Sequence, residues 1–276
     1  MTTATFGRPA VAPTAKGGYG FRTIARMEWH KLRTVRSTWW ILAIFTVSLI
    51  GLAVLVLGHE NYPQLSAADR AAFDPVHDSF IGLVLVQLLT GTLGVLVITT
   101  EFSSGMIRAT FAAAPRRSLV LAAKAAVLGA VTLAAGEIAA FVAFLAGQSA
   151  LQAPAPHATL GQPGVLRAVL LAGAYPALIA LISLGIGAVI RHTAGAITGL
   201  FGLVFVIPVV ATALPDSVRN DVVRLLPGDS ALYPIIATKP AGTAYLFGPY
   251  GQLAVFAGYA AIAVVAGALV FLRRDA

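Results

Sequence analysis

Six stretches of about 20 or more mainly apolar residues run along the chain, and they hold few charged residues. A helix of this length matches the roughly 30 Å thickness of the hydrocarbon layer of a bilayer. Only 11% of the residues are charged, whereas a soluble domain carries about 25%. The sequence therefore predicts an all-α integral membrane protein with six transmembrane helices. The predicted spans are residues 39–58, 80–100, 119–147, 165–190, 194–213 and 251–272.

The 19 Lys and Arg residues divide unevenly between the two alternating sets of connections. Fourteen lie before the first predicted span, between the second and third, between the fourth and fifth, or after the sixth, and five lie in the other set. Basic residues gather on the cytoplasmic side of membrane proteins. We therefore expect a multi-pass protein of the inner (plasma) membrane with both termini cytoplasmic. The net charge of +8 then reflects topology and the lipid bilayer, and no nucleic acid partner is expected.

The N-terminal sequence indicates a disordered tail followed by a helix. Residues 1–20 are rich in Thr, Ala, Pro and Gly and lack the apolar core of a signal peptide, which predicts a disordered cytoplasmic tail. Residues 21–276 are expected to form a single transmembrane domain. Within it, residues 21–38, FRTIARMEWHKLRTVRST, predict one amphipathic helix lying in the cytoplasmic headgroup layer. The alternative is an ordinary basic segment with no fixed tilt.

The predicted interface helix has two distinct faces. Phe21, Ile24, Leu32 and Val35 recur at spacings close to the helical period, while the arginines fall on another face. Tryptophans are common anchors at the membrane surface. The expected anchors are Trp29, Trp39 and Trp40.

Signatures of the common catalytic sites are absent from the sequence. There is no P-loop, no H-E-x-x-H or G-x-S-x-G motif and no cysteine. The pairs His59–Glu60 and His77–Asp78 could meet in a metal site, but solvated charge is the favoured interpretation. We therefore expect a chain that is not an enzyme and that binds no metal or cofactor itself.

Glu137 is the one acid well inside a predicted span. An ionised carboxylate in hydrocarbon costs at least a few kcal/mol, so it needs water, a partner or a proton. Two interpretations stay open: a residue on the transport path, or a hydrogen-bonded Glu that holds two helices together. The GxxxG sequence at Gly195–Gly199 likewise predicts close helix packing, within the chain or between protomers.

Residues 99–124, TTEFSSGMIRATFAAAPRRSLVLAAK, interrupt the apolar pattern on the predicted cytoplasmic side. If Glu101 closes the second span, residues 102–115 are long enough for a short helix across the membrane axis. Gly105 would lie near its start and Pro115 at its end. Such a helix, fixed between two spans, suits mechanical contact with another protein. The alternative is a tight loop whose arginines only set the topology.

This segment resembles the one between the second and third spans of type-2 ABC exporter permeases. In that family an acid, a Gly-Thr-like pair, a Pro-Arg pair and a later Lys recur, and this chain has Met106 where Thr is usual. The segment MEWHKLRTVRSTWW resembles the entry to the first span of actinobacterial members. LGIGAVIRHTAGAITGL, residues 184–200, is similar to their turn between the fourth and fifth spans.

The resemblance implies a permease subunit of an ATP-binding cassette exporter. Such a subunit pairs with a second permease copy or a related permease, and with a separate ATPase subunit that binds ATP and Mg. It also implies a cytoplasmic coupling helix that docks on the ATPase, an adjacent interface helix, and outer re-entrant helices between spans five and six. The residues carried over to the coupling segment are Glu101, Gly105, Arg108, Pro115, Arg117 and Lys124. Those carried over to the interface helix are Glu28, Trp29, Lys31, Leu32 and Arg36.

The expected activity is export of a hydrophobic substrate, such as a drug, an antibiotic or a lipid-like compound. The substrate would leave the cytoplasm or the inner leaflet at the expense of ATP hydrolysed by the partner. Two alternatives remain: a proton- or ion-driven secondary transporter that uses Glu137, and a non-transporting immunity or scaffold protein of the membrane.

Overall fold

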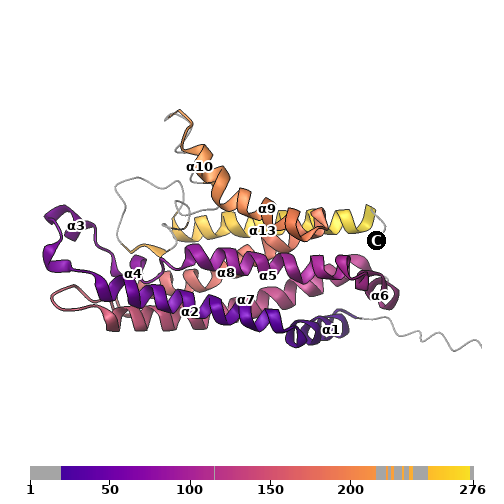
Figure 1. The fold of residues 1–276 in the computed structure, drawn as a ribbon, viewed down its shortest axis with the longest axis horizontal. Coiled ribbons are helices and arrows are strands. Elements are labelled where there is room, and N and C mark those ends of the chain that lie inside the picture. Colours follow the sequence, from indigo (N-terminus) through magenta and orange to yellow (C-terminus); the bar gives the residue numbers. More distant parts are fainter. Residues whose placement is uncertain are drawn as a thin grey trace, which may run out of the picture.

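The computed structural model describes residues 20–114, 116–215, 222, 225, 226, 232, 236–238 and 248–273. These residues form an elongated bundle of helices with no β-strand among them (Figure 1). The first half contains α1 (Phe21–Thr34), α2 (Arg36–His59), the 3₁₀ turn η1 (Tyr62–Gln64), α3 (Ala67–Ala72), α4 (Pro75–Asp78), α5 (Leu83–Ser103) and α6 (Met106–Ala113). The second half contains α7 (Arg117–Ala150), α8 (Val165–Ile190), α9 (Thr193–Phe201), the π-helical turn η2 (Gly202–Val206), α10 (Ile207–Ala211) and α13 (Pro249–Arg273).

Six helical stretches in the described part are long and apolar enough to cross a membrane. This confirms the predicted all-α membrane fold. The stretches are Arg36–His59, Pro75–Ser103, Arg117–Ala150, Val165–Ile190, Thr193–Ala211 and Pro249–Arg273.

The second stretch begins before the predicted residue 80 because a side chain caps its first turn. Asp74 Oδ1 accepts hydrogen bonds from the backbone N–H groups of Val76 and His77, at 3.0 and 3.3 Å. Such a cap satisfies donors that have no partner within the helix. At the other end, Glu101 does not close the span, because α5 continues to Ser103.

Helix α8 is central and packs against α5, α7 and α13. Small residues allow this close approach. A Cβ at Gly136 of α7 would collide with the carbonyl oxygen of Gly173 in α8, and a Cβ at Gly185 would collide with the backbone of Ala263 in α13. In lipid, helices associate largely through such close packing, because apolar side chains gain little by leaving apolar solvent.

The N-terminal helix is shorter than predicted. Residues 21–38 do not form one helix, because Val35 is extended (φ −81°, ψ 113°) and separates α1 from α2. Ile24 and Leu32 are buried as expected, but Val35 is 47% exposed. Ile24 packs against Ala114 and against Val120 of α7, which fixes α1 beside the bundle.

The fifth stretch leaves the bundle as it proceeds. Figure 1 shows the chain diverging from the other helices between α9 and α10. The divergence coincides with η2 and with Pro208 in the first turn of α10, and π-turns and prolines are common causes of helix bending. Gly195 and Gly199 of α9 lie against Ile190 of α8, so this GxxxG packs within the chain.

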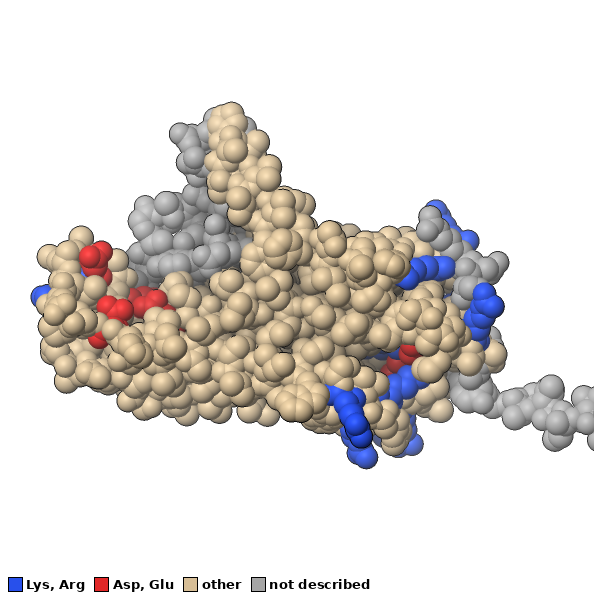
Figure 2. All heavy atoms as spheres, viewed as in Figure 1, with Lys and Arg blue, Asp and Glu red and all other residues tan. Residues whose placement is uncertain are grey.

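Charges are sorted along the long axis of the molecule. Figure 2 shows Lys and Arg gathered at the end that carries α1 and α6, and Asp and Glu gathered mainly at the end that carries α3 and α4. We call these the basic end and the acidic end. Three predictions lie outside the described residues: the disordered tail apart from Gly20, Pro115, and most of the outer segment 214–250 with its re-entrant helices.

Candidate functional site

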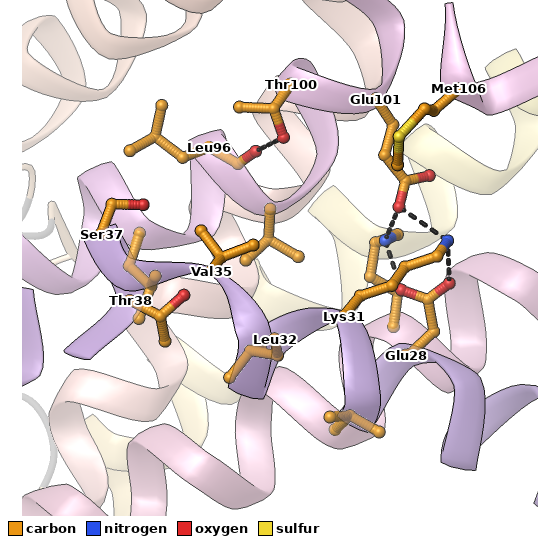
Figure 3. Close-up of a pocket in the computed structure, with 14 residues that line it drawn as sticks. Glu28, Lys31, Leu32, Val35, Ser37, Thr38, Leu96, Thr100, Glu101 and Met106 are labelled. Atoms are coloured by element: carbon orange, nitrogen blue, oxygen red, sulfur yellow. Dashed lines mark hydrogen bonds and ion pairs between the residues drawn. The ribbon is translucent and has the colours of Figure 1, made fainter. Parts of the chain in front are cut away.

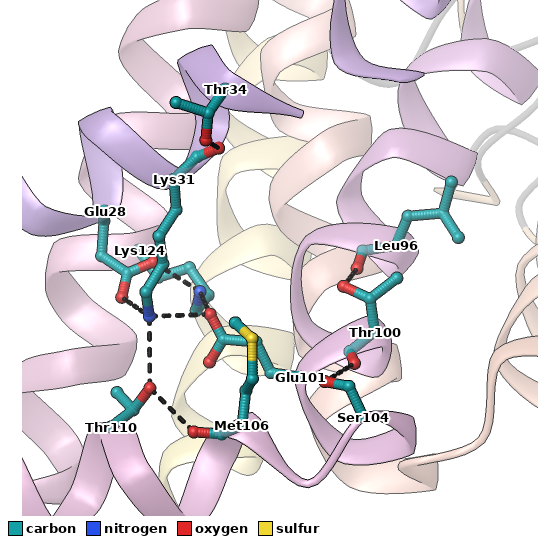
Figure 4. A network of polar contacts seen from close by, with 10 residues as sticks. All are labelled: Glu28, Lys31, Thr34, Leu96, Thr100, Glu101, Ser104, Met106, Thr110 and Lys124. Carbon is teal, nitrogen blue, oxygen red and sulfur yellow. Dashed lines mark hydrogen bonds and ion pairs between the residues drawn. The ribbon is translucent and has the colours of Figure 1, made fainter. Parts of the chain in front are cut away.

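A compact network of charged side chains lies at the basic end (Figure 4). Lys31 Nζ of α1 lies 3.0 Å from Glu28 Oε1 and 2.9 Å from Glu101 Oε1 at the end of α5. Lys124 Nζ of α7 lies 2.5 Å from Glu28 Oε2 and 2.8 Å from Glu101 Oε1. Lys31 also donates a hydrogen bond to Thr110 Oγ1 of α6, at 3.2 Å. The four charged residues, here called the quartet, therefore connect α1, α5 and α7, and through Thr110 they reach α6.

The quartet is buried and electrically balanced. Glu28, Glu101 and Lys124 are only 3%, 4% and 2% exposed, while Lys31 is partly accessible. Two carboxylates face two ammonium groups, so the formal charges cancel. Removing charges from water costs several kcal/mol per ion, and good pairing geometry is needed to offset that cost. The quartet is consequently sensitive to the loss of any one member.

The quartet raises the pKa of the Lys31 ammonium above its ordinary value of 10.5. Burial is the largest single influence and acts to lower this pKa, but the hydrogen bond and charge of Glu101, followed by those of Glu28, together outweigh it. Lys31 therefore stays protonated through the neutral range. Its contribution to stability is fully present below 10.5 and is lost as the pH rises through the raised pKa of the folded state.

Local sequence explains how each helix presents its member. Glu28 and Lys31 are three residues apart on α1, and Leu32 lies beside them on the buried side of the helix. Glu101 stands near the C-terminal end of α5, five residues before α6 begins. Lys124 lies two turns into α7, where it is buried. The packing of these helices then joins residues that are 23 to 96 positions apart in the sequence.

Gly105 makes the turn from α5 into α6. Its φ of +71° lies in the left-handed region, where residues with a Cβ are strained. Helix α6 begins at the next residue, Met106, as the sequence predicted for a short helix in this segment. Ile107 is buried, whereas the adjacent Arg108 is exposed. The helix thus turns one side to the bundle and another side to the surroundings.

A second set of contacts holds the other side of α6. The Phe111 ring of α6 packs edge-on against Phe271 of α13, with centroids 5.7 Å apart. The Arg117 guanidinium lies 5.1 Å from the Phe111 centroid, and its Nη1 donates to the carbonyl oxygen of Phe271 at 3.3 Å. Arg191, at the end of α8, lies over the rings of Phe102 and Phe271. Helix α6 is therefore fixed between α1 and α13.

The remaining residues carried over from the resemblance lie outside the quartet. Trp29 is 40% exposed on α1, Leu32 is buried in the main core, and Arg36 is the exposed first residue of α2. Glu137 lies 13 residues beyond Lys124 on α7, roughly 20 Å along the helix. Its side chain lies against Gly173 of α8, and its Oε2 is buried with no hydrogen-bond partner in the described part of the chain.

Comparison with known proteins adds no assignment. No protein-family model matches the chain, and no curated protein sequence matches it. The helix plan, the sorted charges and the quartet are therefore the observations from which a function must be inferred.

The sequence did not indicate the contacts made by three side chains, those of Thr110, Arg191 and Phe271. Thr110 lies within the segment predicted to be a short helix, but only the docking of α1 shows that its hydroxyl faces Lys31. Arg191 was counted only as a charge that sets topology. Arg191 ends α8 with a left-handed backbone (φ +61°), and its side chain lies beside Phe102 and Phe271.

The histidine pairs considered from the sequence do not meet in a cluster. His77 Nδ1 lies 2.9 Å from Asp78 Oδ1, and His59 Nδ1 lies 2.9 Å from the carbonyl oxygen of Leu55. Among the described residues, no three side chains of His, Cys, Asp or Glu come together as metal ligands would. These pairs therefore give no support to a metal centre.

Proposed function

We propose that this chain is the membrane-spanning permease subunit of an ATP-binding cassette exporter. The observation that carries the proposal is the buried quartet, which joins α1, α5 and α7 beside the short helix α6. A chain of six apolar helices with a short helix secured at its basic end suits a subunit that receives force from another protein.

The attachments of α6 favour a role in transmitting movement. It follows α5 after a two-residue turn and precedes α7, so a push on α6 acts on two spans at once. Lys31 and Thr110 tie it to α1, and Phe111 and Phe271 tie it to α13. Coupling between sites requires a contiguous set of packed elements of this kind. The exposed Arg108 offers a charge on the outward side for a partner.

In this proposal the basic end faces the cytoplasm, in keeping with the positive-inside rule. The sequence has no P-loop, so ATP and Mg would be bound by the separate ATPase subunit. A second permease copy or a related permease would complete the transporter. The transported compound would be hydrophobic, because the spans offer mainly apolar side chains.

The experiment that tests the proposal is affinity capture of the tagged chain from its native membrane. Mass spectrometry and an ATPase assay of the captured material are its readouts. We expect an ATP-binding subunit that is lost in Arg108→Glu and retained in Arg70→Glu, a matched change at the acidic end. Capture of a pure chain without any nucleotide-binding partner would overturn the proposal, as would ATP hydrolysis by this chain alone.

A second candidate is a proton-driven transporter, and one observation favours it. The buried Oε2 of Glu137 has no hydrogen-bond partner among the described residues, and α7 holds it within a span. An acid in that position is a candidate proton carrier. Uptake into vesicles driven by a pH gradient without ATP, and lost in Glu137→Gln, would favour this candidate over the exporter.

A further inference from the structure

The inward side of α1 is occupied by contacts within the chain. Glu28, Lys31 and Leu32 line a cavity of about 100 Å³ between α1, α2, α5 and α7. Figure 3 shows the two charged side chains directed toward Glu101. Ile24, on the same side of α1, packs against α7. The apolar residues that an interface helix turns toward lipid are here used for packing within the protein.

The outward side of α1 carries a row of cationic side chains. The row consists of Arg22, Arg26 and Arg33, with Trp29 between them, and all four side chains are exposed. At 3.6 residues per turn, these positions fall within about 60° of one another around the helix and extend over roughly 17 Å. In the described part of the chain, no carboxylate forms an ion pair with these arginines. We call this set the arginine row.

The arginine row lies at the edge of the membrane-spanning region. Helix α2 begins at Arg36, and its first turn carries Trp39 and Trp40, which are 53% and 69% exposed. Trp39 Nε1 donates a hydrogen bond to the carbonyl oxygen of Arg33 at 2.9 Å, which fixes the end of the row beside this turn. Tryptophans at the end of a span favour the headgroup layer. The row therefore lies at the level of the lipid headgroups.

The position of α1 favours lipid over a soluble partner. Figure 1 shows α1 lying against the side of the bundle, whereas α6 lies at its end, and Figure 2 shows Lys and Arg side chains projecting from that side. Lipids surround a membrane protein on its sides, whereas a soluble partner meets its end. Arginine can hold a phosphate group with two parallel hydrogen bonds. Basic side chains at the membrane surface are also attracted to anionic lipids.

We propose that the outward side of α1 binds the phosphate headgroups of anionic phospholipids, such as phosphatidylglycerol, through Arg22, Arg26 and Arg33. The quartet then holds α1 from the inside, and the lipid holds it from the outside. The site is independent of the proposed exporter function, because it follows from the membrane-spanning fold and the exposed arginines alone.

Photocrosslinking from the centre of the arginine row tests the site. The full chain, with the photoreactive p-benzoylphenylalanine in place of Trp29, is reconstituted in nanodiscs of equal parts phosphatidylglycerol and phosphatidylcholine with matched acyl chains. We expect adducts with phosphatidylglycerol to exceed those with phosphatidylcholine at least about fivefold, the contribution of a single basic side chain near an anionic surface. The ratio should approach one at about 0.5 M NaCl, because salt screens exposed charges.

Variants of the row separate its charge from the general affinity of the protein for lipid. The combined changes Arg22→Gln, Arg26→Gln and Arg33→Gln should bring the ratio close to one, whereas the corresponding changes to Lys should retain most of the preference. The same photoreactive residue in place of Tyr250, which is exposed in the first turn of α13, gives the reference ratio away from the row.

Three results would overturn the proposal. The first is a ratio at Trp29 that equals the reference ratio, or an absence of lipid adducts there. The second is a preference for phosphatidylglycerol that survives the three Gln substitutions or high salt. The third comes from irradiation in the native membrane: adducts with another protein in place of phospholipid would assign the arginine row to an acidic protein surface.

Discussion

Lys124 and Glu28 are 96 positions apart in the sequence, yet their side chains form a 2.5 Å ion pair inside the helix bundle. This contact fixes α1, which lies outside the predicted spans, to the buried side of α7. Glu28 also pairs with Lys31, three residues further along α1, so Glu101 and Glu28 share both ammonium groups. The quartet is thus a joint between α1 and two spans.

We expect the stability of this joint to depend more on its charge balance than on the ion pair between Lys124 and Glu28 itself. Lys124→Met leaves two buried carboxylates facing one ammonium group, and we expect a loss of about 3–5 kcal/mol in the free energy of unfolding. Adding Glu28→Gln restores the balance and should recover part of that loss. Denaturant unfolding in detergent micelles, with the exposed Arg33→Met as a control, provides the measurement. A double variant less stable than Lys124→Met would contradict this account.

The raised pKa of Lys31 predicts an unusual titration of its amine. Competitive acylation over a pH range that brackets 10.5 should give Lys31 an inflection above that value. Glu101→Gln removes its strongest favourable partner and should move the inflection down, and Glu28→Gln should do so to a smaller extent. A lysine in a short unstructured peptide, with a pKa of about 10.4, serves as the reference. An Lys31 inflection at or below that of the peptide would show that burial outweighs the carboxylates.

Substitution of Gly105 should destabilise the protein through backbone strain and not through a steric clash. A Cβ at this position would meet no atom within 4 Å, so the cost of Gly105→Ala comes from its φ of +71° alone. We expect a loss of roughly 1–2 kcal/mol, and less for Gly105→Asn, since Asn tolerates the left-handed region. Gly51→Ala in α2 is the matched control, because its added Cβ also meets open space but its backbone is helical. Thermal unfolding of the three variants distinguishes strain from clash: equal stability of all three would rule out strain at Gly105.

Features that depend on a single segment could be predicted from the sequence, whereas contacts between distant helices could not. The spans were predictable because length and hydropathy are properties of each segment; the predicted 165–190 coincides with α8. The break at Val35 was missed because the apolar and basic periodicity continues across it. Glu28, Lys31, Glu101 and Lys124 were each singled out, but as members of two separate segments. Their pairing depends on how α1 docks on α7, which no local pattern records.

The close packing of α7 on α8 should not tolerate a larger side chain at Gly136. Gly136 meets the backbone of Gly173 so closely that Gly136→Val must push the two helices apart, since a backbone carbonyl cannot turn aside as a flexible side chain can. We expect a loss of more than about 2 kcal/mol in stability, within the range of overpacked cores. Gly258→Val on α13 is the control, because nothing lies within 4 Å of its added Cβ. Thermal unfolding in nanodiscs should separate the two variants clearly. Comparable stability of both would mean that α7 and α8 are not in contact at Gly136, and it would also remove the contact that places Glu137 against α8.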